Sequence, residues 1–421
     1  NFFLRKFVLK KKFLFLKKYT KDNIRKTKKK IYKNKKIVLI TGPLTFGGSE
    51  RQIIKLAEEL EKKKYDVRIC SLWYENKYHT FKIGKNIKVD IIKTSYDPDV
   101  MQKYVYNHKL NFSDYSFFSL HEMMHLFKLH DYLIKQRPDV VHAHLDFYCV
   151  ITGVLAVILD INRALLSTRS MPPHNFVFYR KYFRSAFQAL FKYKNITFVN
   201  NSKAGSIAYD KWLCFPKNTF KTTYNIYDFR KKIKINKINY KKKNNDKIIG
   251  SVLRLDPEKN PLYLLKIFFC LIKKNSNYKF ILIGDGKLAS RIKKLIKKNC
   301  YESKIYLIKN LNNIHDYLYL FDFFVLASRV EGTPNVLLES QHVGTPVFAT
   351  NVGGVKESIA IPYSGALITG KSFKKDSETI HLFIKKFGPL KKIGLKMIRK
   401  KLQHFLPYHS IKKIEQLYNE K

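Results

Sequence analysis

The stretch of residues 322–354, DFFVLASRVEGTPNVLLESQHVGTPVFATNVGG, constrains the fold more than any other part of the chain. It begins with a short apolar run of strand length and passes through a polar loop into a helical pattern. A second apolar run follows and ends in a Gly-Gly turn. Strand, helix and strand in this order form the repeating unit of a parallel sheet. The stretch therefore predicts an α/β domain.

The start of the helix in this stretch suits an anionic ligand. Thr333 is predicted to cap the helix, and Pro334 fits its first turn. Amides at a helix N-terminus bind anions, and carboxylates such as Glu331 and Glu339 accept hydrogen bonds from hydroxyl groups. The pattern favours a ligand that carries phosphate and sugar hydroxyls. The alternative is that Glu339 and Asn335 lie on a solvated helical face.

The same alternation of strands and helices recurs through the chain. Strands are predicted at residues 35–41, 66–72, 87–92, 139–143, 165–168, 196–200, 248–253, 279–283, 305–308, 323–327 and 346–349. We therefore predict an α/β protein with two Rossmann-like domains, residues 36–228 and 248–400. A basic run at residues 229–247 is predicted to link them, and residues 401–421 to form a helical tail that crosses back.

Two features of the first half lie where an α/β sheet would bind a ligand. Gly47 and Gly48 follow the first strand and let a backbone approach closely, although the spacing is not GxGxxG and a plain tight turn is the alternative. Ser49 and Gln52 have the spacing of a capping box for the next helix. His144 follows a strand at its carboxyl end, where it either binds a ligand or only completes the strand end.

The net charge is +50, from 82 Lys and Arg against 32 Asp and Glu. Attraction to an anionic surface explains such a charge, and so does the composition of an AT-rich genome. No nucleic-acid-binding module accompanies the charge, so the predicted partner is an anionic membrane surface and not nucleic acid. Residues 1–35 mix Phe and Leu with Lys, as in an interfacial amphipathic segment, and a frayed basic tail is the alternative.

The five cysteines are scattered and include no CxxC pair, which predicts a reducing compartment without structural disulfides or zinc. No stretch reaches the roughly 20 apolar residues that span a bilayer. These features predict a cytoplasmic protein that is peripheral on the inner face of the cytoplasmic membrane.

Several separated motifs together resemble the retaining glycosyltransferases of family 4, also called glycosyl transferases group 1. They are GGSERQIIKLAEEL, DVVHAHL, SVLRLDPEKNP, FILIGDG and EGTPNVLLESQHVGTPVFATNVGGVKE. The resemblance runs from about residue 36 to residue 357. It implies the GT-B fold, in which two facing Rossmann-like domains have a ligand cleft between them. It also implies a hexosyl-type glycosyltransferase that retains anomeric configuration and needs no metal or cofactor.

The resemblance assigns the donor diphosphate to four residues. Arg254 and Lys259 would bind it, because fixed cations stabilise the charge that a leaving nucleoside diphosphate gains. Gly47 and Gly48 would add amides from the first domain. The donor would be a nucleoside-diphosphate sugar, with the UDP and GDP forms both open. The alternative for Arg254 and Lys259 is that they are two more surface cations.

The resemblance assigns the sugars to other residues. Glu339 would hold the ribose of the nucleotide, Glu331 would orient the transferred sugar, and His144 would lie near that sugar. Arg254, Lys259, Glu331 and His144 are therefore the predicted catalytic set. The helix N-terminus would contact the sugar and its phosphate through residues Gly332, Thr333, Pro334, Asn335 and Val336.

The sequence GTPN after Glu331 departs from the Gly-Phe-Gly common in the family and resembles bacterial surface-polysaccharide enzymes. This favours a glycan or polyprenyl-linked acceptor, in cell-surface polysaccharide or lipopolysaccharide synthesis. Two other classes of function remain open. One is a nucleotide-sugar epimerase or phosphorylase on the same fold, and the other is a basic nucleic-acid-binding protein.

Overall fold

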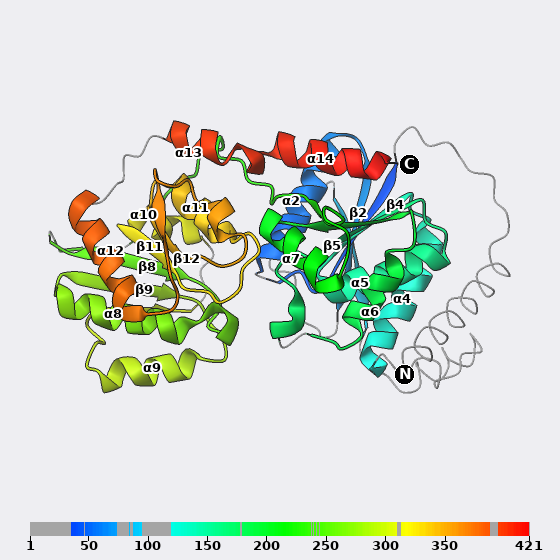
Figure 1. Cartoon of the computed structure of the whole chain (residues 1–421). Helices are drawn as coiled ribbons and strands as arrows, with labels where there is room; N and C mark the ends of the chain where they lie inside the picture. The colour runs from blue at the N-terminus through cyan, green and yellow to red at the C-terminus, as the bar shows by residue number, and fades with distance from the viewer. Residues whose placement is uncertain are drawn as a thin grey trace. The chain divides into compact units, whose positions relative to one another are not determined.

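The computed structural model describes residues 35–45, 47–73, 84, 87–94, 119–176, 179–236, 238, 240, 242–243, 245–309, 313–387 and 395–420. The chain forms two compact units (Figure 1). Unit 1 consists of Asn1–Asn201, Ser206–Ile226 and Ser410–Lys421, and unit 2 consists of Ser202–Gly205 and Tyr227–His409. Residues 1–34 of the predicted membrane-binding arm lie outside the described residues.

Unit 1 is built on a parallel sheet in the order β3-β2-β1-β4-β5-β6-β7. Its strands are β1 (Lys36–Thr41), β2 (Asp66–Trp73), β3 (Lys88–Lys93), β4 (Val140–His144), β5 (Arg163–Ser167), β6 (Ile196–Asn200) and β7 (Lys221–Thr222). Its helices are α2 (Gly48–Lys62), α4 (Leu120–Gln136), α5 (Asp146–Ile158), α6 (Phe183–Leu190), most of α7 (Lys203–Leu213) and most of α14 (Pro407–Asn419).

Alternate residues of β1 face the two helical layers of unit 1, as expected for a strand buried on both faces. Val38 and Ile40 belong to the apolar cluster that includes α4, α5 and α6. Ile37 and Leu39 belong to the cluster that includes α2 and the end of α14. The last helix of the chain is therefore part of the core of unit 1.

Unit 2 repeats this architecture with the strand order β10-β9-β8-β11-β12-β13, again all parallel. The strands are β8 (Lys247–Val252), β9 (Tyr278–Ile283), β10 (Ile305–Ile308), β11 (Phe323–Leu326), β12 (Val347–Thr350) and β13 (Gly365–Ile368). The helices are α8 (Pro261–Lys274), α9 (Ala289–Lys298), α10 (Ile314–Leu320), α11 (Asn335–His342), α12 (Phe373–Phe387) and α13 (Leu395–Lys401).

Both sheets reverse their strand order at one point. Counted from the first strand of its unit, each has the order 3-2-1-4-5-6, and unit 1 adds β7 after its sixth strand. The reversal lies between β1 and β4 in unit 1 and between β8 and β11 in unit 2. Ligands of open α/β sheets bind at the carboxyl ends of the strands at such a point. The predicted class, two Rossmann-like sheets, is confirmed. In each unit, the loops after the two strands at the reversal become candidate ligand-binding loops.

Two predictions of local structure are wrong. The helix α2 begins at Gly48 with Gly47 as its N-cap and no side-chain cap, so Ser49 and Gln52 form no capping box. The buried Gln52 amide instead pairs with the backbone of Ile226. Its Nε2 donates to the Ile226 oxygen at 3.2 Å, and the Ile226 nitrogen donates to its Oε1 at 2.7 Å. Helix α11 begins at Asn335 after Pro334, again without a side-chain cap. At α2, a tertiary contact replaces the predicted local cap.

The basic run at residues 229–247 lies within unit 2 in this structure. Phe229 is fully buried, and Lys242 forms an ion pair of 2.6 Å with Asp322. Asn236 bonds through its backbone nitrogen to Asp316 at 2.8 Å. Within the described parts of the chain, no helix has the length and apolarity required to cross a bilayer.

Candidate active site

The loop after β8 carries Arg254 and Lys259. Leu253 and Leu255 are buried on either side of Arg254, whose own side chain is 56% exposed. A short 3-10 turn, Pro257–Lys259, then leads into α8. The alternation of buried leucines and an exposed guanidinium fixes the backbone of the loop and directs the cation outward.

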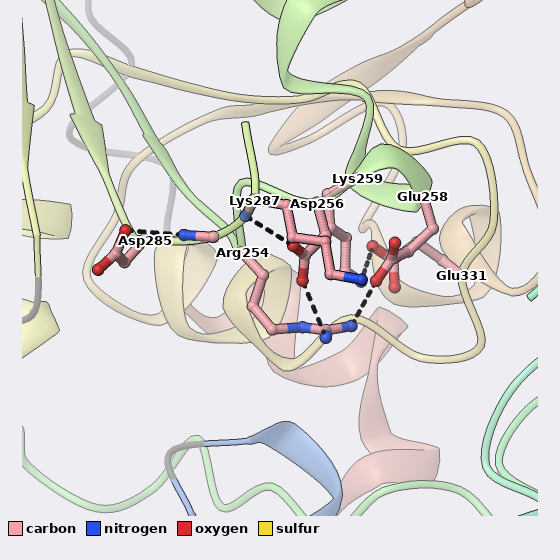
Figure 2. Close-up of polar contacts among 8 residues, drawn as sticks. Arg254, Asp256, Glu258, Lys259, Asp285, Lys287 and Glu331 are labelled. Carbon is pink, nitrogen blue, oxygen red and sulfur yellow. Dashed lines mark hydrogen bonds and ion pairs between the residues drawn. The ribbon is translucent and has the colours of Figure 1, made fainter. Parts of the chain in front are cut away.

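Two carboxylates hold the guanidinium of Arg254 (Figure 2). Nη1 donates to Asp256 Oδ2 at 3.2 Å, and Nη2 donates to Glu258 Oε1 at 2.6 Å. Asp256 Oδ1 also accepts from the backbone nitrogen of Lys287 at 3.1 Å. Arg254 is thereby tied to the turn after β9 as well as to its own loop.

The turn after β9 requires glycine. Gly284 has a φ of +148°, and a Cβ there would lie 1.9 Å from the carbonyl oxygen of Leu253. Gly286 has a φ of +155° and would carry a Cβ 2.8 Å from Leu255. Only glycine allows this approach, so the FILIGDG motif supports the Arg254 loop by direct backbone packing.

Lys259 connects this loop to the loop after β11. Its Nζ lies 2.7 Å from Glu331 Oε1, and Ser328 Oγ donates to the same oxygen at 2.7 Å. The side chain of Glu331 is only 8% exposed, so the carboxylate is held in one orientation by both partners. The sequence prediction missed Ser328, although a small hydroxyl residue three positions before Glu331 was visible.

The helix α11 places the remaining predicted residues of unit 2. Glu339 is 2% exposed, and Thr333, Asn335 and His342 are each 7% exposed. The alternative that Glu339, Asn335 and His342 lie on a solvated face is therefore wrong. Pro334 is the N-cap residue of α11 and makes no side-chain cap bond. The predicted contact of Gly332, Pro334 and Val336 with a sugar and its phosphate stays a prediction.

In unit 1, the glycines lie at the start of α2. Gly47 is the N-cap and Gly48 the first helical residue. A Cβ added to Gly47 would lie 1.9 Å from Glu50 Oε2, so the Glu50 carboxylate lies against this glycine. A phosphate at Gly47 and Gly48 would require Glu50 to move, and the predicted contact stays a prediction.

His144 is the last residue of β4 and is 1% exposed. Neither ring nitrogen has hydrogen-bond geometry with a described residue. Burial lowers its pKa well below the ordinary value, Arg169 and His142 lower it further, and the nearby Ser49 backbone opposes them. His144 is therefore neutral at physiological pH.

His142 lies two residues earlier on the same strand face. It is 1% exposed, and its Nδ1 lies 2.8 Å from the Tyr418 hydroxyl. Burial, with a smaller effect of Arg169, lowers its pKa to about 3. Burial also lowers the pKa of Arg169 to about 10, and its guanidinium donates to Asn225 Oδ1 at 2.5 Å.

Two family models match the chain, one for each half. Residues 46–204 match the Glycosyltransferase Family 4 model, and residues 232–394 match Glycosyl transferases group 1. The chain belongs to the group 1 glycosyltransferases. In this group 1 glycosyltransferase, the first match contains Gly47, Gly48 and His144, and the second contains the loops of Arg254 and Glu331. The recognition made from the sequence motifs is confirmed.

Curated relatives carry names from polysaccharide synthesis. A Vi polysaccharide biosynthesis protein of Salmonella typhi is 24% identical over 386 residues, which are 82% of this chain and 63% of that protein. The chain thus spans less than two thirds of this relative. A galactosyltransferase of Escherichia coli, named for UDP-Gal and GlcNAc-diphosphoundecaprenol, is 32% identical over 129 residues, 30% of this chain and 33% of that protein.

Solved structures confirm the GT-B fold. HepE of Anabaena, solved with UDP and glucose, superposes with a TM-score of 0.68 at 16% identity and covers 92% of this chain and 100% of that chain. WaaG, a glycosyltransferase involved in lipopolysaccharide biosynthesis, superposes with a TM-score of 0.65 at 14% identity and covers 91% and 100%.

Proposed function

We propose that the protein transfers a hexosyl group from a nucleoside-diphosphate sugar to a lipid-linked glycan, with retention of configuration, during bacterial cell-surface polysaccharide synthesis. The observation that carries the proposal is the contact between Lys259 and Glu331 at 2.7 Å. These residues come from motifs 72 positions apart and meet beside the switch point of unit 2. A cation for phosphate and a carboxylate for hydroxyls at one place match the two ends of such a donor.

The donor diphosphate would bind to the cations of unit 2. The exposed guanidinium of Arg254 uses one hydrogen bond from each terminal nitrogen to its carboxylate partners, and its remaining N–H groups suit phosphate oxygens. Lys259 would share its ammonium between Glu331 and the phosphate. As the bond from the anomeric carbon to the phosphate oxygen breaks, Arg254, Lys259 and the N-terminus of α11 stabilise the charge on the leaving group.

The carboxylates would bind the sugars. Glu331 is oriented by Lys259 and Ser328, which leaves its second oxygen for a hydroxyl of the transferred sugar. Glu339, almost fully buried on α11, would accept hydrogen bonds from the ribose hydroxyls. Each hydroxyl that binds a charged acceptor contributes about 1.5–3 kcal/mol.

His144 would form a hydrogen bond with a hydroxyl of the transferred sugar. Its imidazole would do so in the neutral form, because burial lowers its pKa. In a retaining transfer, the acceptor oxygen forms its bond to the anomeric carbon on the face that the phosphate leaves. The acceptor hydroxyl gives its proton to the departing phosphate oxygen. We assign no protein nucleophile to the reaction.

Relatives and charge support the identity of the partners. HepE was solved with UDP and with UDP-glucose, which supports a uridine donor. Relatives of Escherichia coli and Campylobacter jejuni are named for acceptors linked to diphosphoundecaprenol. The net charge of +50 suits an anionic membrane surface, where such an acceptor resides. The proposed place of action is the inner face of the cytoplasmic membrane.

Turnover of UDP-hexoses with a polyprenyl-diphosphate-linked sugar tests the proposal. Arg254→Ala and Glu339→Ala should each lower kcat/KM by about 100-fold, as loss of a single charge-stabilising or orienting group does. Arg291→Ala and Glu302→Ala, at exposed positions of unit 2, serve as matched controls. Full turnover in both test variants would contradict the proposal. An isomerised sugar formed from donor alone would instead identify an epimerase.

A further inference from the structure

The last turn of the chain contacts the histidine pair of unit 1. Tyr418, on α14, is 1% exposed, and its hydroxyl lies 2.8 Å from Nδ1 of His142, 276 positions earlier (the C-terminal helix is red in Figure 1). His142 and His144 lie on one face of β4, since side chains alternate along a strand. Their ring centroids are 5.0 Å apart at an interplanar angle of 73°.

The Tyr418 contact selects one tautomer of His142. If Tyr418 donates to Nδ1, the proton of the neutral ring is on Nε2, and that N–H is the one group left without a described partner. If Nδ1 donates to the tyrosine oxygen, both the Tyr418 hydrogen and the Nε2 lone pair lack partners in the described chain. Unpaired buried polar groups are costly, so the first arrangement is favoured.

Among the described residues, no partner gives the ring of His144 a hydrogen bond of good geometry, although the Ser49 backbone lies near it and raises its pKa. The ring of His142 packs edge to face against the ring of His144. A histidine at a reaction site needs a neighbour that fixes its orientation and tautomer. His142 occupies the place of that neighbour.

We propose that Tyr418 and His142 are positioning residues for His144: the tyrosine hydroxyl fixes the tautomer and the plane of His142, and that ring holds the imidazole of His144. The inference rests on the proposed role of His144 in sugar transfer. It assigns to the C-terminal helix a part in organising the site of unit 1.

The hydroxyl of Tyr418 is not needed to attach α14 to unit 1. Glu415 pairs with Lys63 at 3.2 Å and accepts from Tyr65 at 3.3 Å, and Lys35 donates to the Tyr418 carbonyl at 3.0 Å. Ile411, Ile414 and Leu417 add apolar contacts. Loss of the hydroxyl alone therefore separates positioning from anchoring.

The experiment compares Tyr418→Phe with Tyr65→Phe in the full chain. Both variants lose one tyrosine hydroxyl that bonds at the α14 contact, but only Tyr418 reaches His142. Imidazole nitrogen NMR of histidine-labelled protein reports the tautomers, with His142→Gln and His144→Gln used to assign the signals. UDP binding and steady-state kinetics are measured on the same samples.

We expect His142 in the wild type to carry its proton on Nε2. In Tyr418→Phe, the signals of both His142 and His144 should shift and kcat should fall about tenfold, within the range caused by a slightly misplaced reacting group. UDP affinity, which depends on unit 2, and the KM for the donor should change less than about twofold, and Tyr65→Phe should match the wild type.

An Nδ1-protonated His142 in the wild type would overturn the inference, as would an unshifted His144 signal or wild-type kcat in Tyr418→Phe. The NMR readout does not depend on turnover. A wild type that transfers no sugar but shows the expected signals would refute the proposed function, while the coupling of Tyr418, His142 and His144 would stand.

Discussion

The two units share one strand order but surround their switch points with different chemistry. In unit 2, Arg254 and Lys259 are charged, partly exposed and paired with carboxylates. In unit 1, His142 and His144 are buried and neutral, beside the partly buried guanidinium of Arg169. The difference indicates a division of labour. We propose that unit 2 binds the charged diphosphate and that unit 1 binds an uncharged hydroxyl group.

The carboxylates in unit 2 have a second consequence. They keep the cations in place before a ligand arrives, and a diphosphate that enters must share or replace them. Preorganised charges cost no reorganisation when the leaving group departs. The histidine pair of unit 1 carries no charge for the diphosphate, and we propose that Arg254 and Lys259 of unit 2 supply the preference for it.

The largest expected effect on stability tests the pairing in unit 2. Lys259→Met leaves the Glu331 carboxylate, 8% exposed, without its cation. A broken buried pair costs about 3–5 kcal/mol, and the 21% exposure of Lys259 reduces this to about 2–3 kcal/mol. Urea titrations followed by circular dichroism measure the loss.

Two variants control this measurement. Lys62→Met removes an exposed partner of Glu59 and should cost at most about 0.5 kcal/mol. Adding Glu331→Gln to Lys259→Met should recover part of the loss, because no buried charge then remains. Equal losses for Lys62→Met and Lys259→Met would show that the Lys259–Glu331 pair contributes no more than a surface ion pair.

A smaller effect, in pH dependence, tests the neutral histidines of unit 1. Burial lowers the pKa of His142 to about 3, against about 6.5 in the unfolded chain. As the pH falls, the His142 imidazole is therefore protonated in the unfolded state before it is protonated in the folded state. The stability from this group is complete above pH 6.5 and is lost as the pH falls toward 3, by up to about 1.4 kcal/mol per pH unit.

Tryptophan fluorescence follows this loss selectively, because both tryptophans, Trp73 and Trp212, lie in unit 1. Between pH 6 and pH 5, His142→Gln should lose less unfolding free energy than the wild type, by about 1 kcal/mol. His409→Gln, at an exposed position, should follow the wild type. Identical slopes in all three proteins would show that His142 is not held neutral by folding.

The sequence predicted most of the sheet because buried parallel strands are short, continuous apolar runs. It missed β7, which has two residues, and β13, which begins at Gly365 and has little apolar contrast with its flanks. It predicted the Ser49–Gln52 capping box wrongly because Gln52 pairs with Ile226, 174 positions later. Local sequence patterns do not predict contacts between residues so far apart in the chain.

The candidate site shows the same limit. Arg254, Lys259, Glu331 and Glu339 lie in motifs that can be recognised one by one, and the structure supplies their partners. No sequence pattern indicated a role for Tyr418. In a basic, amphipathic helix, a tyrosine whose hydroxyl bonds to a distant residue has the same sequence pattern as one that only packs. Its bond to His142 exists only through the fold.

The central claim is that unit 2 recognises the diphosphate by its cations, and calorimetric titration of UDP and uridine tests it most directly. The account predicts that the wild type binds UDP at least about 100-fold more tightly than uridine, since two charge-assisted contacts are each worth about 1.5–3 kcal/mol. In Arg254→Ala this preference should fall at least about tenfold, while uridine affinity stays unchanged. Equal binding of UDP and uridine by the wild type, or a preference that Arg254→Ala leaves intact, would contradict it.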